Sequence, residues 1–390
     1  MRRELLISAG PGEWRAALLE DGAAVELYLE RGDLPAPGSV FVGRVIRVLP
    51  GLDAALVDIG TERPGFLPSR RGEKPPEEGA RVVVQLRREA QQDKGALLSA
   101  RIIRPAGSLE LGALLADADR LDPPAQLYPK PNLSGGMALR LLTRPDAIVT
   151  DDVGEIPELR TAFPDVAVAR LDPEVWPVDL DALFEAALSP TLTLPGGGSI
   201  HIAETRAATL IDVDTGIPEA GSFERAALAV NLTATETIAR QLRLRQIGGG
   251  VVVDFAGLEG RVARDEVRQA LAAALAVDPA KPQILGWTRL GHLEVVRPRR
   301  GRPLSAAMLE PESTRKTVVA VAFEALRALQ REARARPAAN WRITASLAVA
   351  AALRGAAARG LKSLEERLGR RIAIATEPED DIRDFDIAPV

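Results

Sequence analysis

The sequence has no cysteine, no long apolar run and no strong excess of charge. Without cysteine, disulfides and thiolate zinc sites are excluded, and a reducing compartment is compatible with that absence. No apolar stretch reaches the roughly 18 residues that a membrane helix needs, so no membrane span is expected. Arg2 and Arg3 precede Glu4 and only a short apolar run, which does not make a signal peptide. We therefore expect a cytoplasmic protein.

The charge is nearly balanced over the chain but unevenly placed along it. A net charge of −4 argues against a uniformly basic nucleic-acid binder. Arginines nevertheless gather at 240–245 and 289–302, whereas much of the acid lies at 377–386. Local potential governs binding to a polyanion, so a local basic groove is allowed. The plainer alternative for any one arginine is a solvated helix face.

A chain of 390 residues predicts two to four domains. Residues 3–32 alternate as β-hairpins do, and 147–170 resembles a βαβ unit. Between them, strands expected at 40–48, 54–59, 81–86 and 96–103, with a turn at 65–68, suit a five-stranded OB-fold barrel. The segment 107–145 is expected to be helical and loop-like.

The second half of the chain shows a strand–helix–strand pattern around two aspartates. Strands are expected at 208–213 and 251–254, joined by a long amphipathic helix at 222–246. Further strands are expected at 191–194, 199–203, 283–288 and 292–296, with a helix at 264–276. Helices near 314–334 and 346–368 and a strand at 371–375 complete the tail, and no internal repeat is found.

Asp212 and Asp254 lie at or near the ends of two apolar strand-like runs. A strand–helix–strand crossover would place them on neighbouring strands, where paired carboxylates favour a hard cation such as Mg²⁺. Asp214 follows Asp212 by two residues, so it shares the same strand face and could ligate the ion or hold a water. The alternative is that these aspartates are helix caps and strand-end turns.

Several ordered blocks of sequence together resemble the ribonuclease E/G family. They are Asp212-Val-Asp-Thr-Gly216, the run 231–245 ending Arg-Gln-Leu-Arg-Leu-Arg245, Gly248-Gly-Gly-Val-Val-Val-Asp-Phe255, Leu194-Pro-Gly-Gly-Gly-Ser-Ile200 and Arg289-Leu-Gly-His-Leu-Glu294. Gly43-Arg-Val45, 54–60, Gly65-Phe-Leu-Pro68 and 85–99 are similar to the family's RNA-binding barrel, and 363–371 to its small C-terminal domain.

The resemblance implies an α+β multidomain chain. It places a ribonuclease-H-like region at 1–35 with 146–189 and an OB-fold RNA-binding domain at 36–105. A reduced 5′-sensor remnant or linker is expected at 106–145, and a deoxyribonuclease-I-like catalytic region at 190–303. A linker and a small C-terminal α/β domain would occupy 304–390.

The resemblance also implies a Mg²⁺-dependent endoribonuclease that cuts single-stranded RNA, leaving 5′-phosphate and 3′-hydroxyl ends. Asp212 and Asp254 would hold the ion, with Asp214 beside them. Phe66 matches an aromatic on which a base could stack, but Leu56 stands where its aromatic partner would be. The alternative for Phe66 is a place in the barrel core. The remaining RNA contacts implied by the resemblance are Lys94, Arg44, Arg289 and Arg243.

Two departures from the family pattern carry further expectations. The zinc-link cysteines are replaced by Leu309-Glu-Pro-Glu312, so no structural zinc is expected and any homodimer would rest on other contacts. The Arg-Thr motif of the 5′-monophosphate sensor has no counterpart in 107–145, which predicts cleavage largely indifferent to the 5′ end. Two other functions remain open: a catalytically weakened RNA-binding or regulatory protein, and a metal-dependent DNA nuclease suggested by fold analogy alone.

Overall fold

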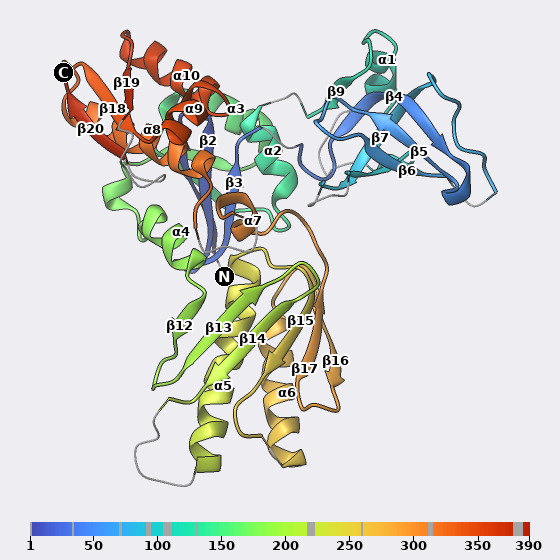
Figure 1. Ribbon diagram of the computed structural model, residues 1–390, viewed down its shortest axis with the longest axis vertical. Helices are drawn as coiled ribbons and strands as arrows, with labels where there is room; N and C mark the ends of the chain where they lie inside the picture. The colour runs from blue at the N-terminus through green and yellow to red at the C-terminus, as the bar shows by residue number, and fades with distance from the viewer. Residues whose placement is uncertain are drawn as a thin grey trace.

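The computed structural model describes residues 2–32, 35–69, 72–90, 95–103, 111–129, 132–216, 223–258, 260–310, 315–376 and 385–390. These residues form four sheets with helices between them, a mixed α+β architecture (Figure 1). No helix within these ranges is both long enough and apolar enough to cross a membrane.

The first sheet is five-stranded, in the order β11-β10-β1-β2-β3. β1, β2 and β3 form an antiparallel meander, while β1, β10 and β11 are parallel. Leu5 and Ile7 face a core shared with α2 and α3, whereas Leu6 faces α4, because alternate strand residues point to opposite faces. The elements are β1 (Arg3–Gly10), β2 (Glu13–Glu20), β3 (Ala23–Glu30), α2 (Leu133–Arg140), β10 (Ala147–Thr150), α3 (Ile156–Ala162), β11 (Ala167–Arg170) and α4 (Leu180–Leu188).

Between β3 and β10 the chain forms a closed five-stranded barrel, consistent with the expected OB-fold. β4 pairs with both β7 and β5, which closes the ring β4-β5-β6-β8-β7. The barrel stands to one side of the other sheets (Figure 1). Its elements are β4 (Val40–Leu49), β5 (Ala54–Asp58), β6 (Gly65–Pro68), β7 (Arg81–Arg88) and β8 (Leu97–Ser99).

The segment expected as a remnant or linker contributes to both of its neighbours. β9 (Ala125–Tyr128) pairs with β4 and adds a sixth strand to the barrel sheet, and α1 (Leu111–Ala118) lies close to β9. α2 instead packs against β3. Arg140 at the end of α2 donates to Glu30 of β3 and to Glu89 beyond β7, so one guanidinium joins the barrel to the first sheet.

The third sheet has six strands, in the order β12-β13-β14-β15-β17-β16. Helices α5 and α6 cover one face with the apolar core that includes Ile211, Val253 and Leu271 (Figure 1). The elements are β12 (Thr191–Thr193), β13 (Ser199–Glu204), β14 (Thr209–Asp214), α5 (Phe223–Leu244), β15 (Gly249–Asp254), α6 (Arg261–Leu275), β16 (Gln283–Trp287) and β17 (Leu293–Arg297). We call the opposite face, which carries Asp212 and Asp254, the open face.

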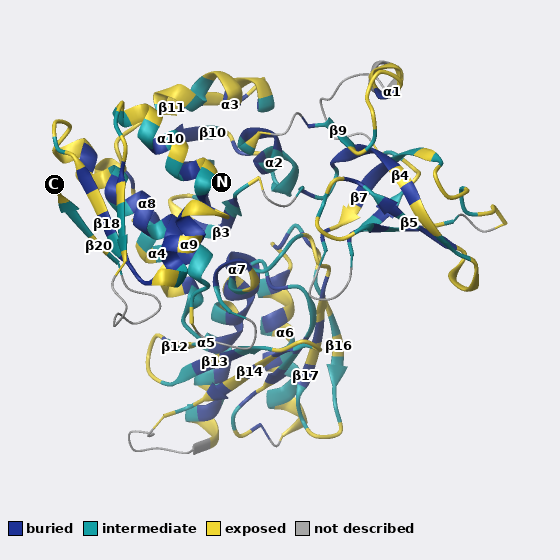
Figure 2. Ribbon diagram, turned by 45° about the horizontal axis from the view of Figure 1, so that its top comes forward, coloured by how far each residue is buried: buried dark blue, intermediate teal, exposed yellow. Residues whose placement is uncertain are grey.

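The C-terminal part is a three-stranded sheet, β19-β18-β20, packed against helices. Buried positions of α8 lie where this unit meets the first sheet (Figure 2). There Arg327 donates to Ser8 at 3.0 Å, and Glu324 of α8 lies 3.6 Å from the guanidinium of Arg15. The elements are α7 (Leu304–Met308), α8 (Val318–Ala335), β18 (Trp341–Ala345), α9 (Leu347–Arg354), α10 (Ala358–Leu368), β19 (Ala373–Thr376) and β20 (Phe385–Pro389).

Candidate metal and RNA site

Asp212 and Asp254 lie side by side on the open face. β14 and β15 are parallel, with α5 as the crossover, and the two aspartates are register partners at the ends of the paired stretch. Neighbouring strands lie about 4.8 Å apart, so the two carboxylates occupy one small region. In β14 the residues alternate strictly, with Ile211 and Val213 buried and Asp212 exposed. The expected juxtaposition is therefore present.

Asp214 shares the exposed side of β14 with Asp212 but has a local partner. Its Oδ1 accepts a hydrogen bond from the backbone N–H of Gly216 at 2.9 Å, which holds the turn after the strand. The loop before β13 packs closely here, because a Cβ on Gly198 would lie 2.5 Å from the carbonyl oxygen of Asp214. Asp214 thus contributes to the shape of the strand end as well as to its negative charge.

Two residues beside the carboxylates were not singled out in the sequence. His292 places its Nε2 3.5 Å from Oδ2 of Asp254. His201 is the register partner of Asp212 on β13, and its Nδ1 lies 3.0 Å from Oγ1 of Thr191. The chain has only two histidines, and both flank the aspartate pair. The strand alternation at 199–204 together with that count was the available signal.

Arg243 does not reach this site, which corrects its expected role in RNA binding. It is buried, and its guanidinium donates to Glu26 at 2.6 Å and to both oxygens of Glu20 at 2.9 and 3.0 Å. Burial disfavours its charge, but the hydrogen bonds to these two carboxylates outweigh that cost and raise its pKa. Arg243 therefore joins α5 to the first sheet, and its guanidinium is not available to a phosphate.

Arg289 and Arg44 remain exposed. Arg289 lies in the turn between β16 and β17, three residues before His292, on the same edge of the sheet as Asp254. Arg44 is on β4 of the barrel, where its side chain donates to the carbonyl of Gly79 at 3.3 Å. Lys94 lies outside the described residues.

Phe66 lies on the outer surface of the barrel, partly exposed and outside the barrel core. Leu56 is its register partner on β5, as expected from the resemblance. On the neighbouring strands, Arg47 of β4 is the register partner of Leu56. On the other side, Leu97 of β8 pairs with Phe66 and also with Arg88 of β7. An apolar strip with an arginine at each end suits a base and its flanking phosphates.

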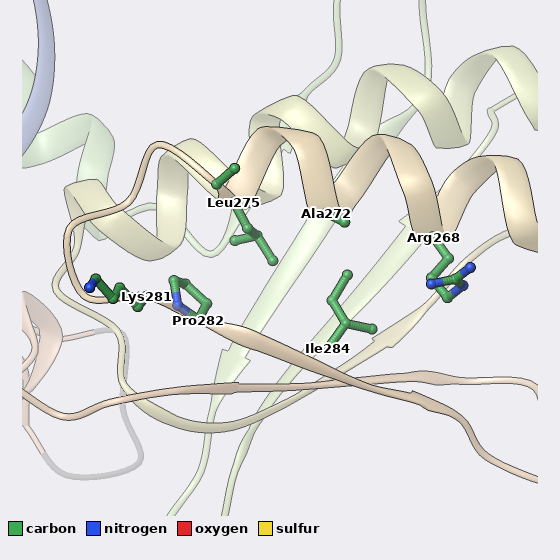
Figure 3. Close-up of a pocket in the computed structure, with 7 residues that line it drawn as sticks. Arg268, Ala272, Leu275, Lys281, Pro282 and Ile284 are labelled. Carbon is green, nitrogen blue, oxygen red and sulfur yellow. The ribbon is translucent and has the colours of Figure 1, made fainter.

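A separate hollow lies between α6 and β16 (Figure 3). It is lined by Arg268, Ala272, Leu275, Lys281, Pro282 and Ile284, among other residues. Ile284 packs against the helix-side core, so this hollow belongs to the covered side of the sheet. It is therefore not part of the aspartate site.

The donor set decides which ion the aspartate pair suits. Within the described ranges, no group of three or more histidine, aspartate or glutamate side chains is placed to hold a metal. Two adjacent exposed carboxylates fit Mg²⁺, which usually keeps several waters and takes one or two carboxylates plus phosphate oxygens. Asp212 and Asp254 would hold such an ion.

The sequence was compared with known proteins. The model of the "Ribonuclease E/G family" matches residues 164–300, which include β12 to β17, both aspartates and both histidines. Ribonuclease G of Salmonella typhimurium (strain SL1344) is 26% identical over 490 residues, covering 99% of each chain. The family model and the full-length relatives together support a member of the ribonuclease E/G family.

Two further relatives show how the similarity is distributed. Ribonuclease G of Escherichia coli (strain K12) is 26% identical over 488 residues, again with 99% of each chain covered. Ribonuclease E of Nostoc sp. (strain PCC 7120) is 43% identical over 129 residues, which is 32% of this chain and 18% of that one. The two ribonuclease G alignments span 490 and 488 positions, more than the 390 residues of this chain.

Proposed function

We propose that this chain is an endoribonuclease that cuts single-stranded RNA with a Mg²⁺ ion held by Asp212 and Asp254. The observation that supports this most directly is the parallel register of β14 and β15, which sets the two carboxylates together on an exposed face. The match to the family model, relatives named ribonuclease G over 99% of the chain and a relative named ribonuclease E over 77% of it support RNA as the substrate.

The residues of the chain have distinct tasks in this proposal. Asp212 and Asp254 supply the negative oxygens, and Asp214 holds the end of β14 through Gly216. Mg²⁺ bound there would activate a water and neutralise charge on the phosphate. Phe66 stacks a base on the barrel, while the arginines of the outer strip and Arg289 attract the backbone.

We further propose that the first sheet is ribonuclease-H-like and the third sheet deoxyribonuclease-I-like. The order β3-β2-β1-β10-β11, with an antiparallel meander followed by parallel strands, supports the first assignment. Without cysteine, any homodimer of this chain would lack a thiolate zinc bridge, and the missing Arg-Thr motif supports cleavage that ignores the 5′ end.

The decisive test is cleavage of an A/U-rich single-stranded oligoribonucleotide by the full chain, with Mg²⁺ or with EDTA. We expect Mg²⁺-dependent products with 5′-phosphate and 3′-hydroxyl ends, identified by mass spectrometry. Asp254→Asn should lower the rate on the order of 100-fold or more, as loss of an electrostatic stabiliser does. Asp265→Asn, on helix α6, serves as the matched control. An inactive wild-type chain that still binds RNA would instead support a binding protein, and equal cleavage of DNA a general nuclease.

A further inference from the structure

A row of polar residues crosses the open face at right angles to the strands. Thr191 pairs with His201, His201 with Asp212, and Asp212 with Asp254. His292 extends the row, because Leu293 after it pairs with Val253 and its Nε2 lies 3.5 Å from Asp254. The two imidazoles therefore bracket the two carboxylates, each about 7 Å from their midpoint at a strand spacing of about 4.8 Å.

The rest of the open face is poor in groups that attract a polyanion. The exposed residues of these fully described strands include Asp214, Glu294 and Leu210, but neither lysine nor arginine occupies an open-face position of β12 to β17. Arg297, the only such residue within these strands, is buried and donates to Asp278 at 2.7 Å. Within these strands His201 is therefore the only basic side chain on the open face, and His292 lies directly before β17, in the same turn as Arg289.

Neighbouring groups hold the imidazole of His201 and the backbone of His292. When Thr191 donates its hydroxyl proton to Nδ1 of His201, the neutral ring carries its own proton on Nε2 and can donate it. His292 is fixed through its backbone: its N–H donates to Oγ1 of Thr288 at 3.1 Å, and its carbonyl accepts from the N–H of Thr288 at 2.8 Å. Oriented N–H donors of this kind bind phosphate oxygens without charge of their own.

We propose that His201 and His292 bind the phosphates on either side of the scissile one. The RNA then crosses the sheet along the row, with the scissile phosphate at Asp212 and Asp254 and one neighbouring phosphate at each imidazole. This assignment rests on the proposed function, since it requires RNA to be cut at the aspartate pair. To that function the assignment adds the path of the RNA across the sheet and the two residues that set this path.

The test uses an oligoribonucleotide with one cleavage site and single methylphosphonates, which remove the charge of one phosphate at a time. For the wild type, we expect a methylphosphonate at either flanking phosphate to raise KM roughly three- to tenfold, the worth of one hydrogen bond. In His201→Val, a methylphosphonate at one flanking phosphate should no longer raise KM. In His292→Leu, the same should hold at the opposite flanking phosphate. Each variant should still respond at the other flank.

Matched variants separate phosphate binding from a structural role. His201→Gln and His292→Gln keep an N–H donor and should recover part of the sensitivity. Ser199→Ala, two residues from His201 on β13 and outside the row, should behave as the wild type. The same pattern is expected for binding to the oligonucleotide in EDTA, measured by fluorescence anisotropy, where no cleavage occurs.

Failure of this phosphate assignment and failure of the proposed endoribonuclease function would give different results. A wild-type chain that cuts no RNA with Mg²⁺ refutes the function itself. If the wild type cuts RNA but the histidine variants keep the full methylphosphonate penalty at both flanks, the assignment of the phosphates is wrong. A His292 variant with lower kcat and unchanged sensitivity would show that His292 acts only on Asp254.

Discussion

Asn231 on α5 and Ala256, two residues beyond Asp254, are joined by two hydrogen bonds. The side-chain amide donates to the carbonyl of Ala256 at 2.7 Å, and the N–H of Ala256 donates to the amide oxygen at 3.0 Å. Asn231 is fully buried, so this contact fixes the backbone that leaves β15 against the crossover helix. The position of Asp254 thus depends on a residue in the middle of α5.

Replacing Asn231 with alanine should therefore affect both stability and catalysis. Two partly buried backbone groups of Ala256 lose their partner, which costs at most about 1–3 kcal/mol of unfolding free energy per unsatisfied group. We also expect a lower kcat on RNA, because the segment carrying Asp254 loosens. Urea unfolding and cleavage rates measure the two effects. Thr233→Ala, two residues further along the same helix, is the control. Equal results for both variants would contradict the role given to the hydrogen bonds between Asn231 and Ala256.

Phe66→Ala should weaken RNA binding while leaving the barrel folded. Stacking on an aromatic is worth about 1–3 kcal/mol per base, and Phe66 lies outside the barrel core. Leu56→Phe should have the opposite effect, since it places a second ring beside Phe66. Fluorescence anisotropy with single-stranded RNA measures both. Phe41→Ala, in the core, should instead lower stability by about 3–5 kcal/mol.

The rate of cleavage should not depend on the 5′ end of the RNA. No Arg-Thr motif of the sensor occurs in 107–145, and the described part of that segment contributes β9 to the barrel and α2 to the first sheet. Matched oligonucleotides with a 5′-monophosphate or a 5′-hydroxyl should give similar kcat/KM. A large preference for the monophosphate would show that another part of the chain senses the end.

Glu20 should make stability depend on pH in acid. Hydrogen bonds from Arg243 hold the pKa of Glu20 below its ordinary value of 4.5. The ion pair therefore stabilises the fold above pH 4.5, and this contribution is lost as the pH falls through the lower folded pKa. Glu20→Gln should be less stable than the wild type at neutral pH, and the two should converge in acid. Urea midpoints across pH test this, with Glu4→Gln as a surface-pair control.

Arg140→Met should destabilise the junction between the barrel and the first sheet. Burial opposes the charge of Arg140, but Glu30 and Glu89 outweigh it and raise its pKa. Removing one partner from a buried ionic cluster costs about 3–5 kcal/mol, because the remaining carboxylates lose their counter-charge. The triple variant Arg140→Met, Glu30→Gln, Glu89→Gln should recover much of that stability in thermal unfolding. No recovery would mean that packing by Arg140, not charge, stabilises the junction.

Local sequence pattern was sufficient to predict an element of secondary structure where its helix or strand periodicity was strong. The helix expected at 222–246 is α5 (Phe223–Leu244), and the strand–helix–strand pattern correctly implied a parallel pair carrying Asp212 and Asp254. The closed barrel was also predicted, but with a turn instead of a strand at 65–68. That segment is β6, because β5 pairs with it along its length and β8 on its other side.

The tail was predicted less well. One helix was expected at 346–368, but the chain forms α9 and α10 with a break at Gly355, and β18 and β20 were not anticipated. These strands are short, and their pairing partners lie far away in the sequence. Short strands of this kind form because the sheet around them satisfies their backbone groups, which local periodicity does not report.

The sequence by itself determined which chemical groups the chain possesses and which short segments can become helix or strand. It supplied the two aspartates, the aromatic of the barrel, and the absence of cysteine. Tertiary structure alone decided which groups meet. Arg243 and Arg289 look alike in sequence, yet Arg243 is enclosed by carboxylates more than 200 positions away, while Arg289 stays exposed. His201 comes beside Asp212 only through strand register. Register is set by hydrogen bonds between distant segments and by the core beneath them, so no local pattern encodes it.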